Sequence, residues 1–203
     1  MALLLKFSRL IDWISNALGK LVMWLVLTAV LISAVNAIVR KAFSISSNAY
    51  LEVQWYLFAG VFMLGAAYVL LHNAHVRIDF IAARLSKRMN ALIDAIGIVV
   101  FLIPLCVILI DLSWPFFMRA YISGEMSENA GGLIRWPVIL LIPVGFGFLL
   151  LQSVSELIKR VAFLRGALPE PFTHGHEKTA EEELIEERQA QDEAAAGAPG
   201  GGR

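Results

Sequence analysis

Two closely spaced histidines are the first residues of this sequence that could carry chemistry. A haem in a small four-helix membrane protein needs axial ligands, and histidine is a usual one. His72 and His75 lie near the same end of one apolar stretch, while His174 and His176 lie in a polar tail. No histidine of another apolar stretch faces the first pair. The sequence therefore disfavours haem, but it leaves a haem-binding or redox-complex membrane anchor as an alternative.

Four acidic side chains, Glu52, Asp94, Asp111 and Glu156, lie close to apolar stretches. An ion path or a proton relay needs ionisable groups at membrane depth, where they are costly unless function requires them. We expect all four acids at the ends of their helices, within reach of water. The sequence therefore predicts neither an autonomous ion path nor an enzyme. We expect no catalytic, cofactor-binding or metal-binding residue, and no nucleic-acid partner.

Four apolar stretches must position these residues, and each is close to the ~20 residues that a helix needs to cross a bilayer. They cover residues 21–39, 53–71, 92–112 and 137–154. Apolar residues make up 58% of the chain, and its mean hydropathy is +0.69. A water-soluble core of this composition could not be covered by the polar surface that remains. The sequence predicts an all-α membrane protein with four transmembrane helices.

The segments around these stretches are more polar. Residues 1–20 place apolar and basic side chains on opposite helical faces, which predicts an amphipathic helix lying on the membrane surface. Residues 78–92 indicate a second surface helix. We assign the four-helix membrane domain to residues 21–160. Residues 161–203 form an acidic cytoplasmic tail that cannot bury enough apolar area to order itself, so we expect it to be disordered.

Positive charge is distributed unequally between the two sides of the membrane. Up to Arg165, ten Lys and Arg residues fall before the first stretch, between the second and third, or after the fourth, whereas four fall on the other side. The positive-inside rule then places both termini in the cytoplasm. The chain starts without a basic region ahead of a long apolar core, so we expect no cleaved signal peptide.

Small residues recur every four positions in the first stretch, at Ala29, Ser33 and Ala37. In a membrane such a stripe allows another helix to approach closely, because van der Waals contact replaces the hydrophobic drive available in water. We therefore predict that this stripe is a helix-packing face.

Two prolines mark expected helix ends. The fourth helix is predicted to begin at Trp136, because Pro137 then falls in the first turn, where its missing N–H costs nothing. The third helix is predicted to end between Asp111 and Pro115.

Polar residues gather at the two membrane boundaries. At the inner boundary they are His75, Arg77 and Asp79, and at the outer boundary Glu52, Glu125, Ser127, Glu128 and Gly132. One interpretation is that Arg77 and Asp79 anchor their loop at the headgroups, and that Glu125 and Glu128 form surface ion pairs with Arg119 or Arg135. The other is that both boundaries bind partner proteins.

Four short motifs follow one another along the membrane part of the chain. They are Glu52-Val-Gln-Trp-Tyr-Leu-Phe, Leu64-Gly-Ala-Ala-Tyr68, His75-Val-Arg77-Ile-Asp79, and Gly124-Glu125-Met-Ser127-Glu128-Asn129 continuing to Trp136-Pro137. In this order and on this topology they resemble the small membrane subunit, of the DctQ type, of tripartite ATP-independent periplasmic (TRAP) transporters. The resemblance covers about residues 15–160, and the tail lies outside it.

The resemblance implies a three-part transporter in the bacterial inner membrane. In that family a periplasmic binding protein delivers an organic acid, and a large membrane subunit moves it using a sodium gradient. The small subunit packs against the large one, so the polar boundary residues become candidates for partner interfaces. A membrane assembly factor without a transport role stays open as a further alternative.

Overall fold

The computed structural model of the chain describes residues 2–43, 48–73, 85–129, 131–168 and 188. Two compact units are distinguished, Met1–Pro171 and Phe172–Arg203, and all the helices below belong to the first. The predicted inner-boundary residues His75, Arg77 and Asp79 lie outside the described residues, as does the acidic tail apart from residues 161–168 and Arg188.

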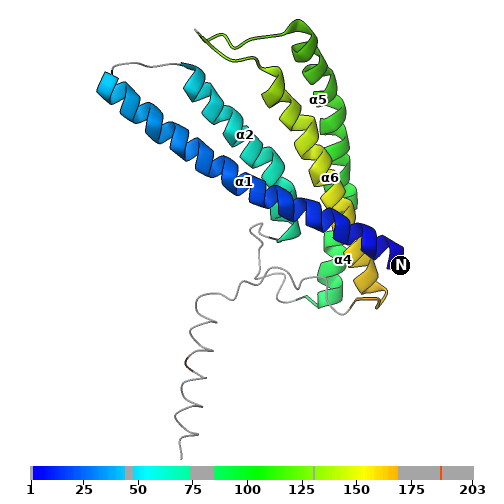
Figure 1. Ribbon diagram of the computed structural model, residues 1–203. Helices are drawn as coiled ribbons and strands as arrows, with labels where there is room; N and C mark the ends of the chain where they lie inside the picture. The colour runs from blue at the N-terminus through cyan, green and yellow to red at the C-terminus, as the bar shows by residue number, and fades with distance from the viewer. Residues whose placement is uncertain (1, 44–47, 74–84, 130, 169–187, 189–203) are drawn as a thin grey trace, which may run out of the picture. The chain divides into compact units, whose positions relative to one another are not determined.

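The first unit is built from helices (Figure 1). They are α1 Ala2–Phe43, α2 Asn48–Leu71, α4 Lys87–Gly97, the π-helical turn η1 Ile98–Leu102, α5 Ile103–Ser123 and α6 Trp136–Leu164. Four segments are long and apolar enough to cross a membrane: Leu3–Phe43, Asn48–Leu71, Lys87–Ser123 and Trp136–Leu164. The prediction of an all-α protein with four spanning helices is therefore confirmed. The orientation of its termini stays a prediction.

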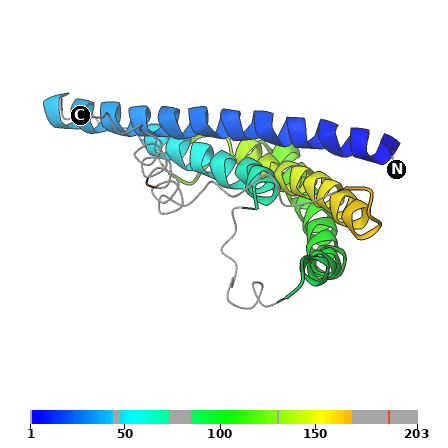
Figure 2. The same cartoon turned by 90° about the horizontal axis from the view of Figure 1, so that it is seen from below.

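Helix α1 is a single helix that includes both the predicted surface segment and the first predicted span. Its 42 residues extend about 63 Å at about 1.5 Å per residue, roughly twice the thickness of the hydrocarbon layer. Its first half lies against α6 and its second half against α2, as Figure 2 shows. The apolar side chains Leu3 and Leu10 of the first half point away from both neighbours and are exposed.

The inner face of α1 follows a seven-residue repeat. Two series of buried or half-buried positions recur at this spacing: Ser8, Ser15, Val22, Ala29 and Asn36, of which all but Val22 are small or polar, and the aliphatic Ile11, Leu18, Leu25, Ile32 and Val39. A repeat of this period keeps one seam of a long helix facing its partners, as in coiled coils. This seam faces α6 along the first half of α1 and α2 along the second.

Helix α6 occupies the centre of the unit, in contact with α1, α2, α4 and α5 (Figure 1). Its approach to α2 is closest at Gly145, where an added Cβ would lie 2.7 Å from the Met63 carbonyl oxygen. Against α5 it packs Ile139 into a small core with Phe117 and Ala120. Close backbone contact at glycine is typical of helix packing in membranes.

The third span is longer than predicted, while the start of the fourth is confirmed. Helix α5 continues past Pro115 to Ser123 and ends at Gly124, which adopts a left-handed conformation with φ of 61°. Pro115 lacks a backbone N–H, so its presence removes one hydrogen bond, to the carbonyl of Asp111. The helix continues because the turns beyond the proline pack Phe117 against α6. Helix α6 begins at Trp136, as predicted.

Candidate functional site: a buried clasp, a polar cluster and an acidic groove

The carboxylate of Glu52 holds the loop between α5 and α6. Glu52 lies in the first turns of α2 and is 3% exposed. It accepts hydrogen bonds from Asn129 Nδ2 at 2.7 Å, from the backbone N–H of Leu133 at 2.6 Å and from Ser127 Oγ. All three donors come from residues more than 70 positions further along the chain. We call Glu52 and these three donors the Glu52 clasp.

The loop itself is a short, tight hairpin. Met126 and Ile134 form an isolated antiparallel bridge, and the Ser127 N–H donates to the Leu133 carbonyl at 2.9 Å. At Gly132 an added Cβ would lie 2.6 Å from Ser127 Cβ and 3.0 Å from the Glu52 carboxylate. Glycine is therefore the residue that lets the loop close on the acid.

The remaining predicted acids of the outer boundary lie on the surface of the loop. Glu125 forms an ion pair with Arg135, and both side chains are about two-fifths exposed. Glu128 is exposed and has no ion pair within the part of the chain that the structure describes. The prediction that Glu125 pairs with a nearby arginine is thus confirmed, whereas the assignment of these residues to a partner interface stays a prediction.

The small-residue stripe of α1 is only partly covered by its own chain. Ala29 is fully buried, and Ser33 accepts a hydrogen bond from Gln54 of α2. Ser33 and Ala37 are exposed. The role of the whole stripe as a packing face therefore stays a prediction. Ala29 is the member of the stripe that is buried within the unit.

A second polar assembly lies where the first half of α1 meets the last turns of α6. Asp12 accepts hydrogen bonds from Gln152 Nε2 at 3.0 Å and from Ser155 Oγ at 2.8 Å. Gln152 in turn accepts from Ser15 Oγ at 2.7 Å and is completely buried. Ser8 and Ser155 share a hydrogen bond of 2.6 Å. These contacts fasten the polar side of the predicted surface segment to the end of α6.

Charged groups extend this assembly toward α4. Glu156 is 5% exposed and forms ion pairs with Lys159 and Arg160. Lys159 also approaches both Asp12 oxygens at 3.3 Å, and Arg160 Nε lies 3.4 Å from Asp94 of α4. We call the residues of this assembly the α1–α6 polar cluster: Ser8, Asp12, Ser15, Asp94, Gln152, Ser155, Glu156, Lys159 and Arg160.

The expectation that the four acids reach water at helix ends is wrong for three of them. Glu52 and Glu156 are buried: the Glu52 carboxylate accepts hydrogen bonds from the loop between α5 and α6, and the Glu156 carboxylate pairs with Lys159 and Arg160 of its own helix. Asp111 lies inside α5 because the helix continues beyond Pro115. Asp94 is partly exposed and contacts Arg160. Sequence reasoning did not single out Asp12 or Gln152 as site residues, although serine recurs on the seam of α1 at Ser8 and Ser15.

His72, the described member of the histidine pair, is packed within the unit. Its Nε2 lies 2.9 Å from Asn16 Oδ1 of α1, and its ring centroid lies 4.2 Å from that of Tyr68. The Tyr68 ring in turn covers Gly19, where an added Cβ would overlap it. These contacts join the end of α2 to the middle of α1.

Taken together, the geometry fixes segments in place. The Glu52 clasp ties a loop to α2, and the α1–α6 polar cluster ties α1, α4 and α6 to one another. Each buried acid at these two places has its donors or cations in contact, which is the arrangement that makes burial of a charge tolerable. Asp111 differs, because it faces out of the unit.

Comparison with known proteins identifies a family. No curated protein and no solved structure gives a significant match. The sequence model of the family described as "Tripartite ATP-independent periplasmic transporters, DctQ component" matches residues 29–163, which include all of α2, α4, α5 and most of α6. With four membrane-spanning helices and this match over more than half of its length, the chain belongs to the DctQ family, the small membrane component of TRAP transporters.

Proposed function

We propose that this chain is the stationary subunit of a TRAP transporter that imports an organic acid across the bacterial inner membrane. Its partners would be a large membrane subunit, which moves the substrate with a sodium gradient, and a periplasmic binding protein. The observation that carries the proposal is the DctQ match over residues 29–163. This family is a transporter component, so the haem-anchor and assembly-factor alternatives lose their support.

The polar contacts favour a supporting role over a transporting one. A moving gate or relay needs ionisable groups that change partners, whereas Glu52 and Glu156 are each held by several contacts within the unit. Breaking such a buried pair leaves an uncompensated charge and costs about 3–5 kcal/mol. A unit braced in this way suits a fixed scaffold, beside which a second subunit moves.

The outward faces of the helices favour a membrane partner. Large apolar side chains are exposed along all four spans, among them Trp24 on α1, Phe62 on α2 and Phe101 on η1. In a bilayer such faces contact lipid or another helix. The same unit therefore offers ample surface for a large membrane subunit without exposing its polar contacts.

Reconstitution tests this function directly. The chain is placed in liposomes alone, with the large subunit, and with both the large subunit and the binding protein, and uptake of a radiolabelled organic acid is followed under a sodium gradient. We expect uptake only from the full set. Uptake by this chain alone, or full uptake without it, would overturn the proposal.

A further inference from the structure

Asp111 lies at membrane depth. Phe117 and Ala120 of α5 pack on Ile139 of α6, and extending this antiparallel register places Asp111 level with about Phe148. That level is about 18 Å along α6 from Trp136 and about 12 Å from Glu156, at about 1.5 Å per residue. Asp111, on α5, therefore lies level with the apolar middle of α6, far from either end of that helix.

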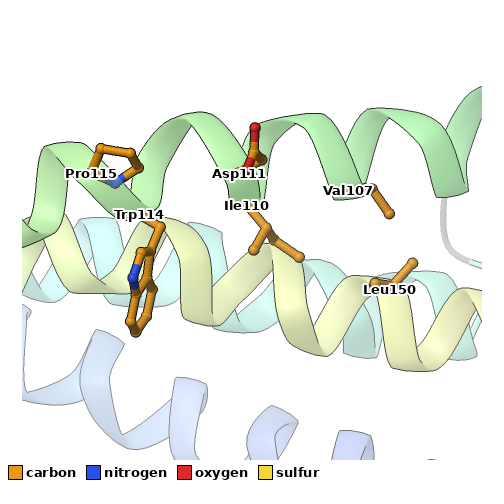
Figure 3. A pocket seen from close by; sticks show the side chains of 6 residues that line it. All are labelled: Val107, Ile110, Asp111, Trp114, Pro115 and Leu150. Atoms are coloured by element: carbon orange, nitrogen blue, oxygen red, sulfur yellow. The ribbon is translucent and has the colours of Figure 1, made fainter.

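Asp111 lines a shallow groove on the outside of the unit. The groove has a volume of about 420 Å³ and is lined by Val107, Ile110, Asp111, Trp114 and Pro115 of α5 and by Leu150 of α6 (Figure 3). Val107 is 50% exposed and Trp114 52% exposed, so this side of α5 faces away from the other helices. Asp111 is the one ionisable side chain of the lining.

Asp111 has no counter-charge among the residues that the structure describes. The carboxylate has neither a hydrogen bond nor an ion pair within the described segments of the chain. Pro115 has no N–H and so cannot donate to the Asp111 backbone carbonyl. Ionisable groups within membrane spans almost always pair with another group. By this register Asp111 is a charge at membrane depth that has no partner among the described residues.

We propose that this groove is a docking site for one transmembrane helix of the large membrane subunit, and that this helix presents an arginine or lysine to Asp111. This inference rests on the proposed function. A cation is favoured because it complements the carboxylate in a medium of low dielectric constant. A lipid headgroup would lie at the membrane surface instead. A second copy of this chain, packed symmetrically, would bring two Asp111 carboxylates together.

The first test compares the chain alone with the chain in its complex. We expect Asp111→Asn and Asp111→Leu to weaken association with the large subunit at least about tenfold, since truncating one member of a desolvated charge pair leaves the other unpaired. The thermal stability of the isolated chain should be unchanged or higher, because Asp111 has no partner there. Leu112→Ala is the matched control, since Leu112 is 65% exposed on a different side of α5, and it should leave both readouts unchanged.

The second test maps the contact with a photo-crosslinker. Benzoylphenylalanine in place of Trp114 should link to the large subunit, whereas the same group in place of Leu112 should link several-fold less. Three results would each overturn the docking site. The first is that Asp111→Leu associates with the large subunit as tightly as the wild type, and the second is that Asp111→Leu destabilises the isolated chain as much as it weakens association. The third is that the crosslinker at position 114 links to a second copy of this chain. If the wild-type chain does not associate with the large subunit at all, the proposed function fails instead.

Discussion

The Glu52 clasp makes the most direct prediction about local stability. Glu52→Gln preserves the size of the side chain, but it replaces one acceptor oxygen by an N–H₂ group. Three donors converge on the two carboxylate oxygens: Ser127 Oγ, Asn129 Nδ2 and the Leu133 N–H. The new amide nitrogen must therefore face at least one donor that it cannot accept from. The loop should then detach from α2 more often.

The size of the effect follows from the contacts. A hydrogen bond to a charged group contributes about 1.5–3 kcal/mol, and the others weaken when the charge is removed. Losing one such bond, with some weakening of the other two, costs about 2–3 kcal/mol. Each 1.4 kcal/mol is a factor of ten in an equilibrium. The population with an open loop should rise about 30- to 150-fold.

Limited proteolysis of the loop in detergent measures this population, because cleavage of a transiently opened segment follows its opening equilibrium when closing is fast. We expect Glu52→Gln to be cut between Gly124 and Arg135 much faster than the wild type. Glu128→Gln is the matched control, since Glu128 is exposed and lies in the same loop. If the two variants are cut at the same rate, or if Glu52→Gln resembles the wild type, the clasp does not hold the loop.

Three other predictions concern packing, docking and topology. Gly145→Ala should lower the free energy of unfolding by about 1–3 kcal/mol in thermal scans, because its Cβ would meet the Met63 backbone, whereas Gly147→Ala, with nothing within 4 Å, should not. Glu128→Gln should reduce uptake most at low binding-protein concentration and low salt, because exposed charges steer encounter; a defect that is independent of both would count against docking at this loop. A reporter active only in the periplasm should work when fused near Ser123 and fail after Arg165; the reverse pattern would contradict the predicted orientation.

The spans could be predicted because hydropathy is a property of each segment by itself. Twenty apolar residues indicate a membrane helix whatever surrounds them. Trp136-Pro137 predicts a helix start by itself, because proline is favoured in the first turn of a helix. The end of α5 could not be predicted in this way. Asp111 and Pro115 lower the local helical signal, but packing of Phe117 against Ile139 outweighs it, and that contact joins residues of different spans.

The clasp was only partly predictable. Its members Glu52 and Ser127, and Gly132 beside them, stand out in the sequence, yet nothing in their spacing shows that a loop folds onto the start of α2, and the donors Asn129 and Leu133 were not predicted. That contact depends on how α2 and the α5–α6 pair lie together. A carboxylate that reads as a docking residue can therefore be a buried acceptor, and its neighbour Glu128 becomes the better candidate for contact with a binding protein.

The α1–α6 polar cluster and Asp111 show why burial decides the role of an acid in a membrane protein. Glu156 and Asp111 are both isolated acids beside apolar runs in the sequence. Glu156 meets Lys159 and Arg160 one helical turn away on its own helix, and Asp12 brings the opposing helix to the same place. Asp111 has only apolar residues around it in its groove. The first acid therefore joins helices within the unit, and the second is left for a helix of another subunit.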